Sequence, residues 1–299
     1  MVVAQSLEQA AAAARLVEVG YAAAEPLLDP GDPRAERAEN ASGRDVTRGD
    51  VAAGLAAAEV VVAATYATPA QTNNPLGLFA ATAYWDGDLL TVHDTTQGPV
   101  FARRALAVAF GLPETAVRVL APFVGGAFGA GLRTWPHVVL AALAARVVGR
   151  PVKLVLSRAQ MFTSIGYRPP TVQHVRLGAR RTGELVAIDH EGTEPTALED
   201  DFAESRTRAT AVLYDCPNMS GRTRQVRLNV ACPTWMRGPG EAPGVFALEC
   251  ALDELAYELD IDPLDLRLRN YAETHPQPGR PWSSKALRAS YARGAERFG

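Results

Sequence analysis

The chain has 299 residues, 47% of them hydrophobic and 21% charged, a balance typical of a folded globular protein rather than a disordered one. Its formal net charge is −3 and its arginines are scattered, which argues against binding to nucleic acid or to an anionic membrane surface. The three cysteines match no zinc or iron–sulfur spacing and the first residues lack the regions of a secretion signal, so we expect reduced thiols and a cytoplasmic location.

Capping residues and hydrophobic periodicity predict alternating helices and strands along the chain. Ser6 and Gln9 form a capping box before an alanine-rich run, 26–48 reads as a linker, and Asp50 and Asp262 each precede a further helix. The predicted helices cover 10–19, 51–58, 100–110, 137–148, 245–260 and the residues after 262. The predicted strands cover 60–66, 80–85, 89–93, 116–121 and 151–156, with a further hairpin at 176–189.

One of these helices carries a clear apolar stripe. Leu248, Leu252, Leu255 and Leu259 recur at helical spacing, and we expect them to pack into a core. No internal repeat accompanies this pattern. The order of the elements predicts a mixed α+β fold.

A run of small residues after the strand at 116–121 is the first candidate for chemistry. It reads Val-Gly-Gly-Ala-Phe-Gly-Ala-Gly at 124–131. Glycines allow backbone N–H groups to approach an anionic ligand closely. The run departs from the dinucleotide fingerprint, and no Lys-Ser or Lys-Thr pair follows as in a P-loop. Two interpretations stay open from this run alone: a binding loop, or glycines that allow two backbone segments to pack closely.

A second loop reads Trp-Met-Arg-Gly-Pro-Gly-Glu-Ala-Pro-Gly at 235–244. Its glycines and prolines favour a fixed direction for the guanidinium of Arg237, which suits a carbonyl or carboxylate substrate or a cofactor phosphate. A surface arginine in a turn is the alternative. Glu241 lies near the start of the next predicted helix, and we interpret it as supporting that helix terminus rather than catalysis.

In their order along the chain and in their amino-acid sequence, these loops resemble those of the molybdenum subunit of the xanthine dehydrogenase and aldehyde oxidase family. The resemblance is to the bacterial aldehyde oxidase type of this subunit. The other matching segments are Thr-Gln-Gly at 96–98, Gly-Arg-Pro-Val-Lys-Leu-Val-Leu-Ser-Arg at 149–158, Gly-Tyr-Arg-Pro at 166–169 and Trp-Ser-Ser-Lys at 282–285. The resemblance implies an α+β molybdenum-cofactor-binding domain. In that family a pterin dithiolene holds the metal, so we expect no metal ligand from the protein.

The resemblance also implies roles for individual residues. The backbone at Phe128 and Gly129 would lie beside the molybdenum, and Gln97 would lie near the pterin. Arg237 would be the catalytic residue of this chain, orienting the group that is oxidised. The implied cofactor-binding residues are Gln97, Gly125, Gly126, Ala127, Phe128, Gly129 and Arg237.

The chain departs from the family in one segment and matches only part of its length. The segment 71–79 resembles a family motif that reads His-Asn-Pro-Met-Glu-Pro-His. In this chain, Gly77 and Phe79 replace the acidic residue and the histidine of that motif. We expect 1–45 to be a remnant of a preceding hammerhead-like domain with a linker, 46–270 to be the first molybdenum-cofactor-binding domain, and 271–299 to begin a truncated second one. The family's general-base glutamate has no match here, so we expect the chain to be inactive alone.

The implied function is that of a molybdenum hydroxylase, an oxidoreductase that acts on aldehydes or N-heterocycles. Its molybdopterin-type molybdenum cofactor is expected as a dinucleotide, with iron–sulfur clusters and FAD only on an iron–sulfur subunit and a FAD-binding subunit. One alternative is a non-catalytic fragment or paralogue that binds partner subunits without cofactor, which the altered segment at 71–79 favours. The other is an unrelated nucleotide enzyme with a glycine loop.

Overall fold

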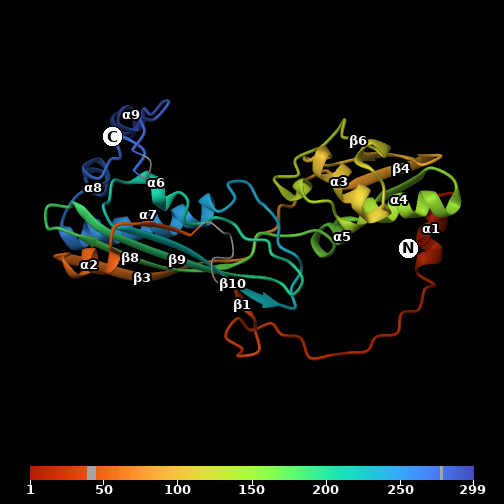
Figure 1. Ribbon diagram of the computed structural model, residues 1–299, viewed down its shortest axis with the longest axis horizontal. Helices are drawn as coiled ribbons and strands as arrows, with labels where there is room; N and C mark the ends of the chain where they lie inside the picture. The colour runs from red at the N-terminus through yellow and green to blue at the C-terminus, as the bar shows by residue number, and fades with distance from the viewer. Residues whose placement is uncertain (39–44, 277–278) are drawn as a thin grey trace. The chain divides into compact units, whose positions relative to one another are not determined.

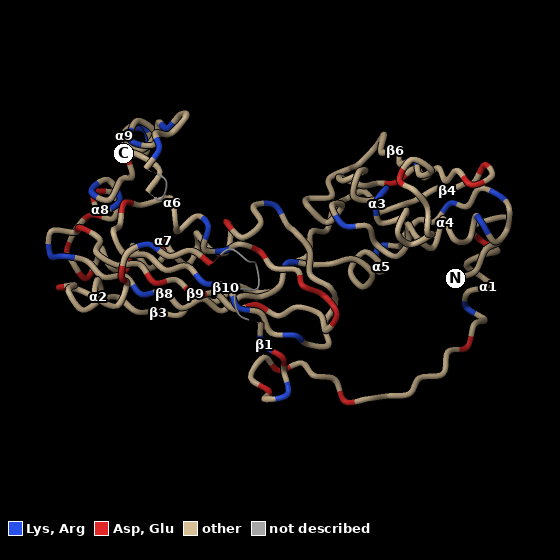
Figure 2. The backbone as a smooth tube through the Cα atoms, in the orientation of Figure 1, with Lys and Arg blue, Asp and Glu red and all other residues tan. Residues whose placement is uncertain are grey.

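The computed structural model describes residues 1–38, 45–276 and 279–299, and the chain forms two compact units (Figure 1). Each unit is assembled from three separate stretches of chain. The first unit comprises Met1–Leu28, Gln71–Arg168 and Ala231–Arg237. The second unit comprises Asp29–Ala70, Pro169–Val230 and Gly238–Gly299. Basic and acidic residues are interspersed along the described parts of both units (Figure 2), as the scattered arginines of the sequence predict.

A four-stranded sheet with the order β6-β5-β4-β7 forms the centre of the first unit. Its strands are β4 (Ala80–Asp86), β5 (Leu89–Asp94), β6 (Val117–Leu120) and β7 (Val152–Val155). β4 is antiparallel to both β5 and β7, whereas β5 and β6 are parallel. The helices are α1 (Leu7–Ala14), α3 (Pro99–Phe110), η1 (Glu114–Ala116), η2 (Ala130–Leu132), α4 (Pro136–Val148) and α5 (Arg158–Thr163).

The direction of the strands in this sheet positions two segments of later importance. Residues that follow two parallel neighbouring strands leave the sheet at the same edge. The segment 95–98 follows β5 and the glycine-rich run follows β6, so both emerge at one edge. α4 packs on this sheet, against β4. The two elements approach closely because the facing residues are alanines, among them the fully buried Ala83 and Ala141.

The second unit is built on a six-stranded sheet with the order β1-β10-β9-β8-β3, and β2 also pairs with β10. β9 and β10 are parallel, and the other pairs are antiparallel. Its strands are β1 (Arg37–Ala38), β2 (Val46–Arg48), β3 (Val60–Thr68), β8 (Thr171–Ala179), β9 (Leu185–Ala197) and β10 (Met219–Leu228). Its helices are α2 (Val51–Ala56), α6 (Thr210–Leu213), α7 (Glu241–Leu259), α8 (Pro263–Arg269) and α9 (Leu287–Phe298).

The leucine stripe predicted from the sequence is confirmed on α7. Leu248, Leu252 and Leu255 are 0% exposed, and Leu259 packs at the margin of the same cluster. The helix lies across β3 and β8 and covers one face of the sheet. Apolar burial of this kind contributes about 1.5–3 kcal/mol for each large side chain.

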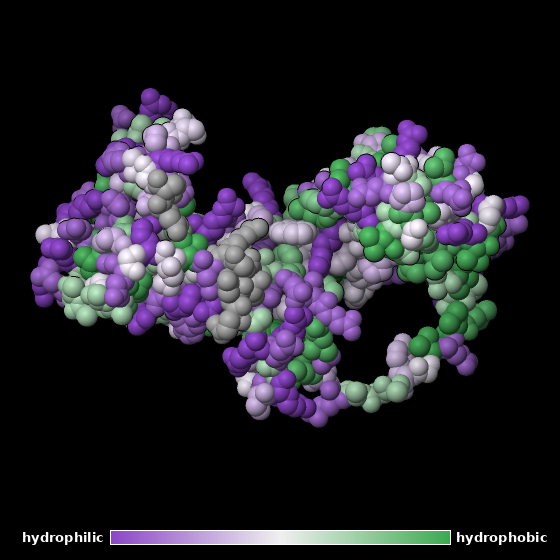
Figure 3. Space-filling view, viewed as in Figure 1, coloured by the Kyte–Doolittle hydropathy of each residue, from purple (hydrophilic) through white to green (hydrophobic). Residues whose placement is uncertain are grey.

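Several predicted boundaries are wrong. The first helix ends at Ala14 instead of continuing to residue 19, because it buries no side chain and short unsupported helices are marginal in water. Leu16 and Tyr21, in the segment after this helix, are exposed. Hydrophobic residues lie on the surface along this segment in the space-filling view (Figure 3). α7 begins at Glu241, earlier than predicted, because Pro243 falls in its first turn, where a missing N–H costs nothing.

Other differences concern segments without a strong periodic pattern. The predicted linker at 26–48 contains the short strands β1 and β2, and the polar C-terminal segment contains α9. The part of the linker at 39–44 lies outside the described residues. Among the described helices, none is both long and apolar enough to cross a membrane.

Candidate functional site

The glycine-rich run turns sharply between β6 and η2. Gly125, Ala127, Phe128 and Gly129 have φ angles of 70°, 45°, 54° and 106°, all in the left-handed region. Such angles are uncommon for residues other than glycine and persist only where surrounding contacts hold the backbone. Ala127 is fully buried in a cluster with Phe79, whereas Phe128 is exposed. The run is therefore a loop whose unusual conformation is held by its neighbours.

Gln97 emerges after β5 and its side chain contacts this loop directly. Oε1 of Gln97 accepts a hydrogen bond from the N–H of Gly129 at 2.9 Å. The backbone N–H of Gln97 donates to the carbonyl of Gly131 at 2.8 Å, and the Thr96 hydroxyl donates to the same carbonyl at 2.9 Å. The structure therefore brings Gln97 together with the glycine loop, two elements that the sequence assigned to one site.

The second predicted loop packs against the first. A Cβ atom at Gly129 would lie 2.6 Å from the carbonyl oxygen of Trp235, so this close approach requires glycine. Arg237 follows on the same loop with an exposed side chain. Within the described residues, its guanidinium has no protein partner, while its backbone carbonyl accepts a hydrogen bond. The loop backbone is thus held, and the guanidinium stays available to a ligand.

Two buried side chains that sequence reasoning missed hold these loops in place. Asn73 is 8% exposed, and its Nδ2 donates to the carbonyls of Phe128 and Trp235, both at 2.9 Å. Arg168 is 4% exposed, and its Nη2 donates to the carbonyls of the two residues after Trp235, at 2.8 and 2.9 Å. Both residues lie in segments that carry the family resemblance, which is the one signal in the sequence that pointed to them.

The glycine loop also presents donors to solvent. Gly125 and Gly126 are exposed, and no protein acceptor for their backbone N–H groups is seen in the part of the chain that the structure describes. Successive N–H groups in a left-handed turn form a concave binding site for anions. The loop can therefore receive an anionic group on its exposed side while Asn73 and Gln97 hold it from the protein side.

Comparison with known protein families identifies the family in which these loops occur. Residues 34–271 match the model of the molybdopterin cofactor-binding domain. The chain belongs to this family. The matched range contains every predicted site residue, from Gln97 to Arg237, together with Asn73 and Arg168. The donor set fits the family's cofactor, because the exposed N–H groups of the glycine loop suit its anionic oxygens.

Individual relatives agree with the family match. The chain is 37% identical over 303 residues to the aldehyde oxidoreductase molybdenum-binding subunit PaoC of Escherichia coli (strain K12), covering 100% of this chain and 41% of PaoC. It is 29% identical to the putative xanthine dehydrogenase molybdenum-binding subunit XdhA of the same organism, covering 85% of this chain and 35% of XdhA. The chain thus spans less than half the length of these relatives.

Solved structures show the same fold. The aldehyde oxidoreductase from Desulfovibrio gigas superposes with a TM-score of 0.83 at 25% sequence identity, covering 98% of this chain and 35% of that one. Quinoline 2-oxidoreductase from Pseudomonas putida 86 superposes with a TM-score of 0.84 at 22% identity, covering 99% and 41%. The α+β fold expected from the sequence is therefore confirmed as that of the molybdopterin cofactor-binding family.

Two buried titratable groups lie in the first unit near these segments in sequence. Burial raises the pKa of Asp94, at the end of β5, to about 7, because the charged form loses its hydration. Burial lowers the pKa of His137, in the first turn of α4, to about 4. The ring of His137 stacks on Phe79 at a centroid distance of 6.2 Å, and neither of its nitrogens has a partner among the described residues. His137 is therefore neutral near pH 7, whereas Asp94 titrates there.

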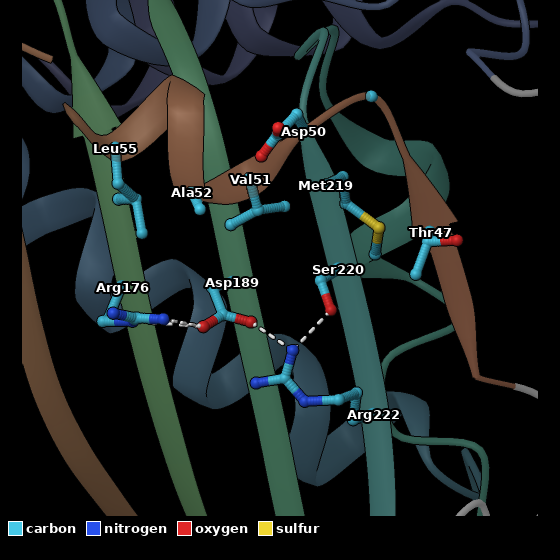
Figure 4. A pocket seen from close by; sticks show the side chains of 11 residues that line it. Thr47, Asp50, Val51, Ala52, Leu55, Arg176, Asp189, Met219, Ser220 and Arg222 are labelled. Atoms are coloured by element: carbon cyan, nitrogen blue, oxygen red, sulfur yellow. Dashed lines mark hydrogen bonds and ion pairs between the residues drawn. The ribbon is translucent and has the colours of Figure 1, made fainter. Parts of the chain in front are cut away.

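A separate cavity of 590 Å³ lies within the second unit and contains none of the predicted site residues (Figure 4). On its floor, Asp189 forms ion pairs with Arg176 and Arg222, at 2.5 and 2.8 Å. These arginines hold the pKa of Asp189 below its ordinary value, against the effect of its burial. Arg222 also pairs with Glu191 at 2.8 Å, so two carboxylates compensate the two arginines, and we interpret the cavity as part of the sheet's structure. Of the described residues, no three His, Cys, Asp or Glu side chains gather as metal ligands in either unit.

Proposed function

We propose that this chain is the molybdopterin-cofactor-binding part of a molybdenum hydroxylase that oxidises aldehydes or N-heterocycles. The observation that carries the proposal is the left-handed glycine loop, which is fixed by Gln97 and offers the N–H groups of Gly125 and Gly126 to an anion. The family match supports the identity of that anion. The names of PaoC and XdhA support the two substrate classes.

In this proposal, the chain binds and orients while the cofactor supplies the oxidising metal centre. The loop from Gly125 to Gly129 holds the cofactor through the backbone donors of Gly125 and Gly126, so no protein side chain needs to bind the metal. Gln97 keeps the N–H of Gly129 directed inward through its Oε1. Arg237 orients the substrate, because its planar guanidinium has five donors and no partner within the described residues.

The proposal extends to the organisation of the complete enzyme. PaoC and XdhA are molybdenum-binding subunits, and this supports partner chains for the present protein. We infer an iron–sulfur subunit and a FAD-binding subunit, a dinucleotide form of the cofactor and a cytoplasmic location. We also infer that 1–45 derive from a hammerhead-like domain, that 46–270 are the first cofactor-binding domain and that 271–299 begin the second.

The test is to purify the assembly that contains this chain and to measure its molybdenum by mass spectrometry and its pterin by fluorescence. Both are expected, together with oxidation of an aldehyde or a purine by an artificial electron acceptor. Arg237→Lys should lower turnover about tenfold with unchanged molybdenum, because lysine cannot reproduce the planar fork. An assembly without molybdenum or pterin would contradict the proposal and favour a paralogue that binds partners without cofactor, as the change at Gly77 suggests.

A further inference from the structure

The amide of Asn73 joins two segments that are far apart in the chain. Its Nδ2 donates to the carbonyl of Phe128 and to the carbonyl of Trp235, each at 2.9 Å. An amide nitrogen carries two hydrogens, so both are consumed by these two contacts. Oδ1 of Asn73 is buried and has no partner among the described residues. A flipped amide would place that oxygen against both carbonyls, so the orientation of the side chain is fixed by the contacts themselves.

One of these contacts controls a peptide group at the centre of the glycine loop. The carbonyl of Phe128 and the N–H of Gly129 belong to the same planar peptide unit. Asn73 binds the carbonyl end of this unit, and Oε1 of Gln97 binds the N–H end at 2.9 Å. A planar group that is held at both ends resists rotation, although Phe128 has a left-handed φ angle of 54° that favours relaxation.

The other contact extends the same control to the loop that carries Arg237. Trp235 O is the atom that a Cβ at Gly129 would meet, so the two loops touch where Asn73 holds both of them. Arg168 binds the next two carbonyls of this loop. Three successive carbonyls are thus turned toward buried donors, and this arrangement fixes the backbone from which the side chain of Arg237 projects.

We propose that Asn73 is a positioning residue that locks the Phe128–Gly129 peptide and couples it to the loop of Arg237. A buried oxygen without a partner costs free energy, and the arrangement persists because the same amide supplies two donors at the junction of the loops. The consequence for cofactor and substrate rests on the proposed function, but the lock itself is a property of the protein alone.

The test replaces the donor with an acceptor of the same shape. In Asn73→Asp, a carboxylate faces two carbonyl oxygens and cannot donate, whereas its protonated form can donate to one of them. We expect backbone hydrogen exchange, measured by mass spectrometry on the purified assembly at about pH 8, to become about tenfold faster in peptides covering 125–131 and 233–237. Relative to wild type at the same pH, the increase should shrink at about pH 5, because burial beside two carbonyl oxygens raises the pKa of the new carboxyl and favours its protonated form there.

A neighbouring asparagine provides a matched control. Asn74 is exposed, and its Oδ1 accepts a hydrogen bond from Arg158 at 3.1 Å. Asn74→Asp makes the same chemical change but keeps an acceptor in place, so exchange at 125–131 should stay as in wild type. If Asn73→Asp does not fold, Asn73→Ser retains one small neutral donor and should raise exchange in the same two peptides.

The outcomes separate the lock from the proposed function. Wild-type exchange in the Asn73 variants, or an equal effect of Asn74→Asp, overturns the lock. Faster exchange at both loops in an assembly that never contains molybdenum supports the lock and contradicts the proposed function. Where wild type carries molybdenum, Asn73→Asp should retain less of it at pH 8 than at pH 5, whereas Asn73→Ser, which has no titrating group at this position, should not show this pH profile.

Discussion

Gly129 in the first unit and Gly244 in the second both lie where no side chain fits, but for different reasons. A Cβ atom at Gly129 would be 2.6 Å from the carbonyl of Trp235, and one at Gly244 would be 2.0 Å from the carbonyl of Arg206. Gly244 lies inside α7 and is buried, whereas Gly129 lies in a loop with a φ angle of 106°. One glycine permits packing of a helix, and the other permits a backbone shape that serves a site.

The surroundings of the two glycines differ in the same way. Near Gly244, Arg206 and Glu194 form an ion pair in which both side chains are almost completely buried. Glu204 accepts a hydrogen bond from the N–H of Gly240 at 2.9 Å, which fixes the start of α7. Buried charges tolerate little displacement, because breaking the pair leaves an uncompensated charge. Near Gly129, the peptide is held by hydrogen bonds with the neutral side chains of Asn73 and Gln97, and displacing it costs less free energy than breaking the buried ion pair.

The largest effect is expected at Gly244. Gly244→Ala should lower the free energy of unfolding by about 3 kcal/mol, because the new methyl group displaces the backbone that carries Arg206. Denaturant unfolding followed by circular dichroism measures this loss. Gly294→Ala in α9 is the matched control, since a Cβ atom there meets nothing within 4 Å and alanine favours the helix. Equal stability of the two variants would break the comparison.

A change at Gly129 should act on the site instead. Gly129→Val should reduce molybdenum content about thirtyfold, or ~2 kcal/mol, while the free energy of unfolding falls by ~2 kcal/mol, less than at Gly244. Metal analysis and denaturant unfolding of the same preparation give the two numbers. Gly149→Val serves as the control, because its φ angle of 63° imposes the same kind of strain with nothing within 4 Å. A loss of stability at Gly129 as large as that at Gly244 would assign both glycines to packing.

Asp94 provides a pH-dependent comparison within the first unit. Its folded pKa of about 7 lies above the ordinary value of 3.8, so wild type loses stability as the pH rises between these values. Asp94→Asn removes the titrating group, and it should gain about 2.5 kcal/mol relative to wild type between pH 5 and pH 8. Thermal unfolding at the two pH values measures the gain. A constant difference between variant and wild type would show that Asp94 is charged throughout.

The sequence predicted the elements that repeat a pattern and missed contacts that depend on a single atom. The hairpin of β4 and β5, the proline that opens α4 and the buried face of α7 follow from periodicity and caps, which are local signals. The glycine loop and Gln97 were assigned to one site through resemblance, and the parallel pairing of β5 and β6 explains physically why they meet. The prediction that Arg237 is catalytic remains to be tested.

Asn73 and Arg168 could not be assigned in this way. Each lies next to the carbonyls that it binds only after residues about 60 to 160 positions away have folded against it, and side-chain donors to irregular backbone leave no periodic trace. The early end of α1 has a related cause, because an alanine-rich run has high helix propensity, but its few large side chains, such as Leu7 and Leu16, stay exposed and do not stabilise it.

The composition of the first unit from three stretches of chain has a consequence for biosynthesis. The ribosome delivers Asn73 and the glycine loop early, but the carbonyl of Trp235 emerges only after the whole stretch Pro169–Val230, which belongs to the other unit. During translation, one hydrogen of the Asn73 amide therefore has no Trp235 carbonyl to bind while strands of the second unit are being synthesised. The site is therefore completed late, because a nascent chain that ends before residue 235 lacks the second acceptor of the Asn73 amide.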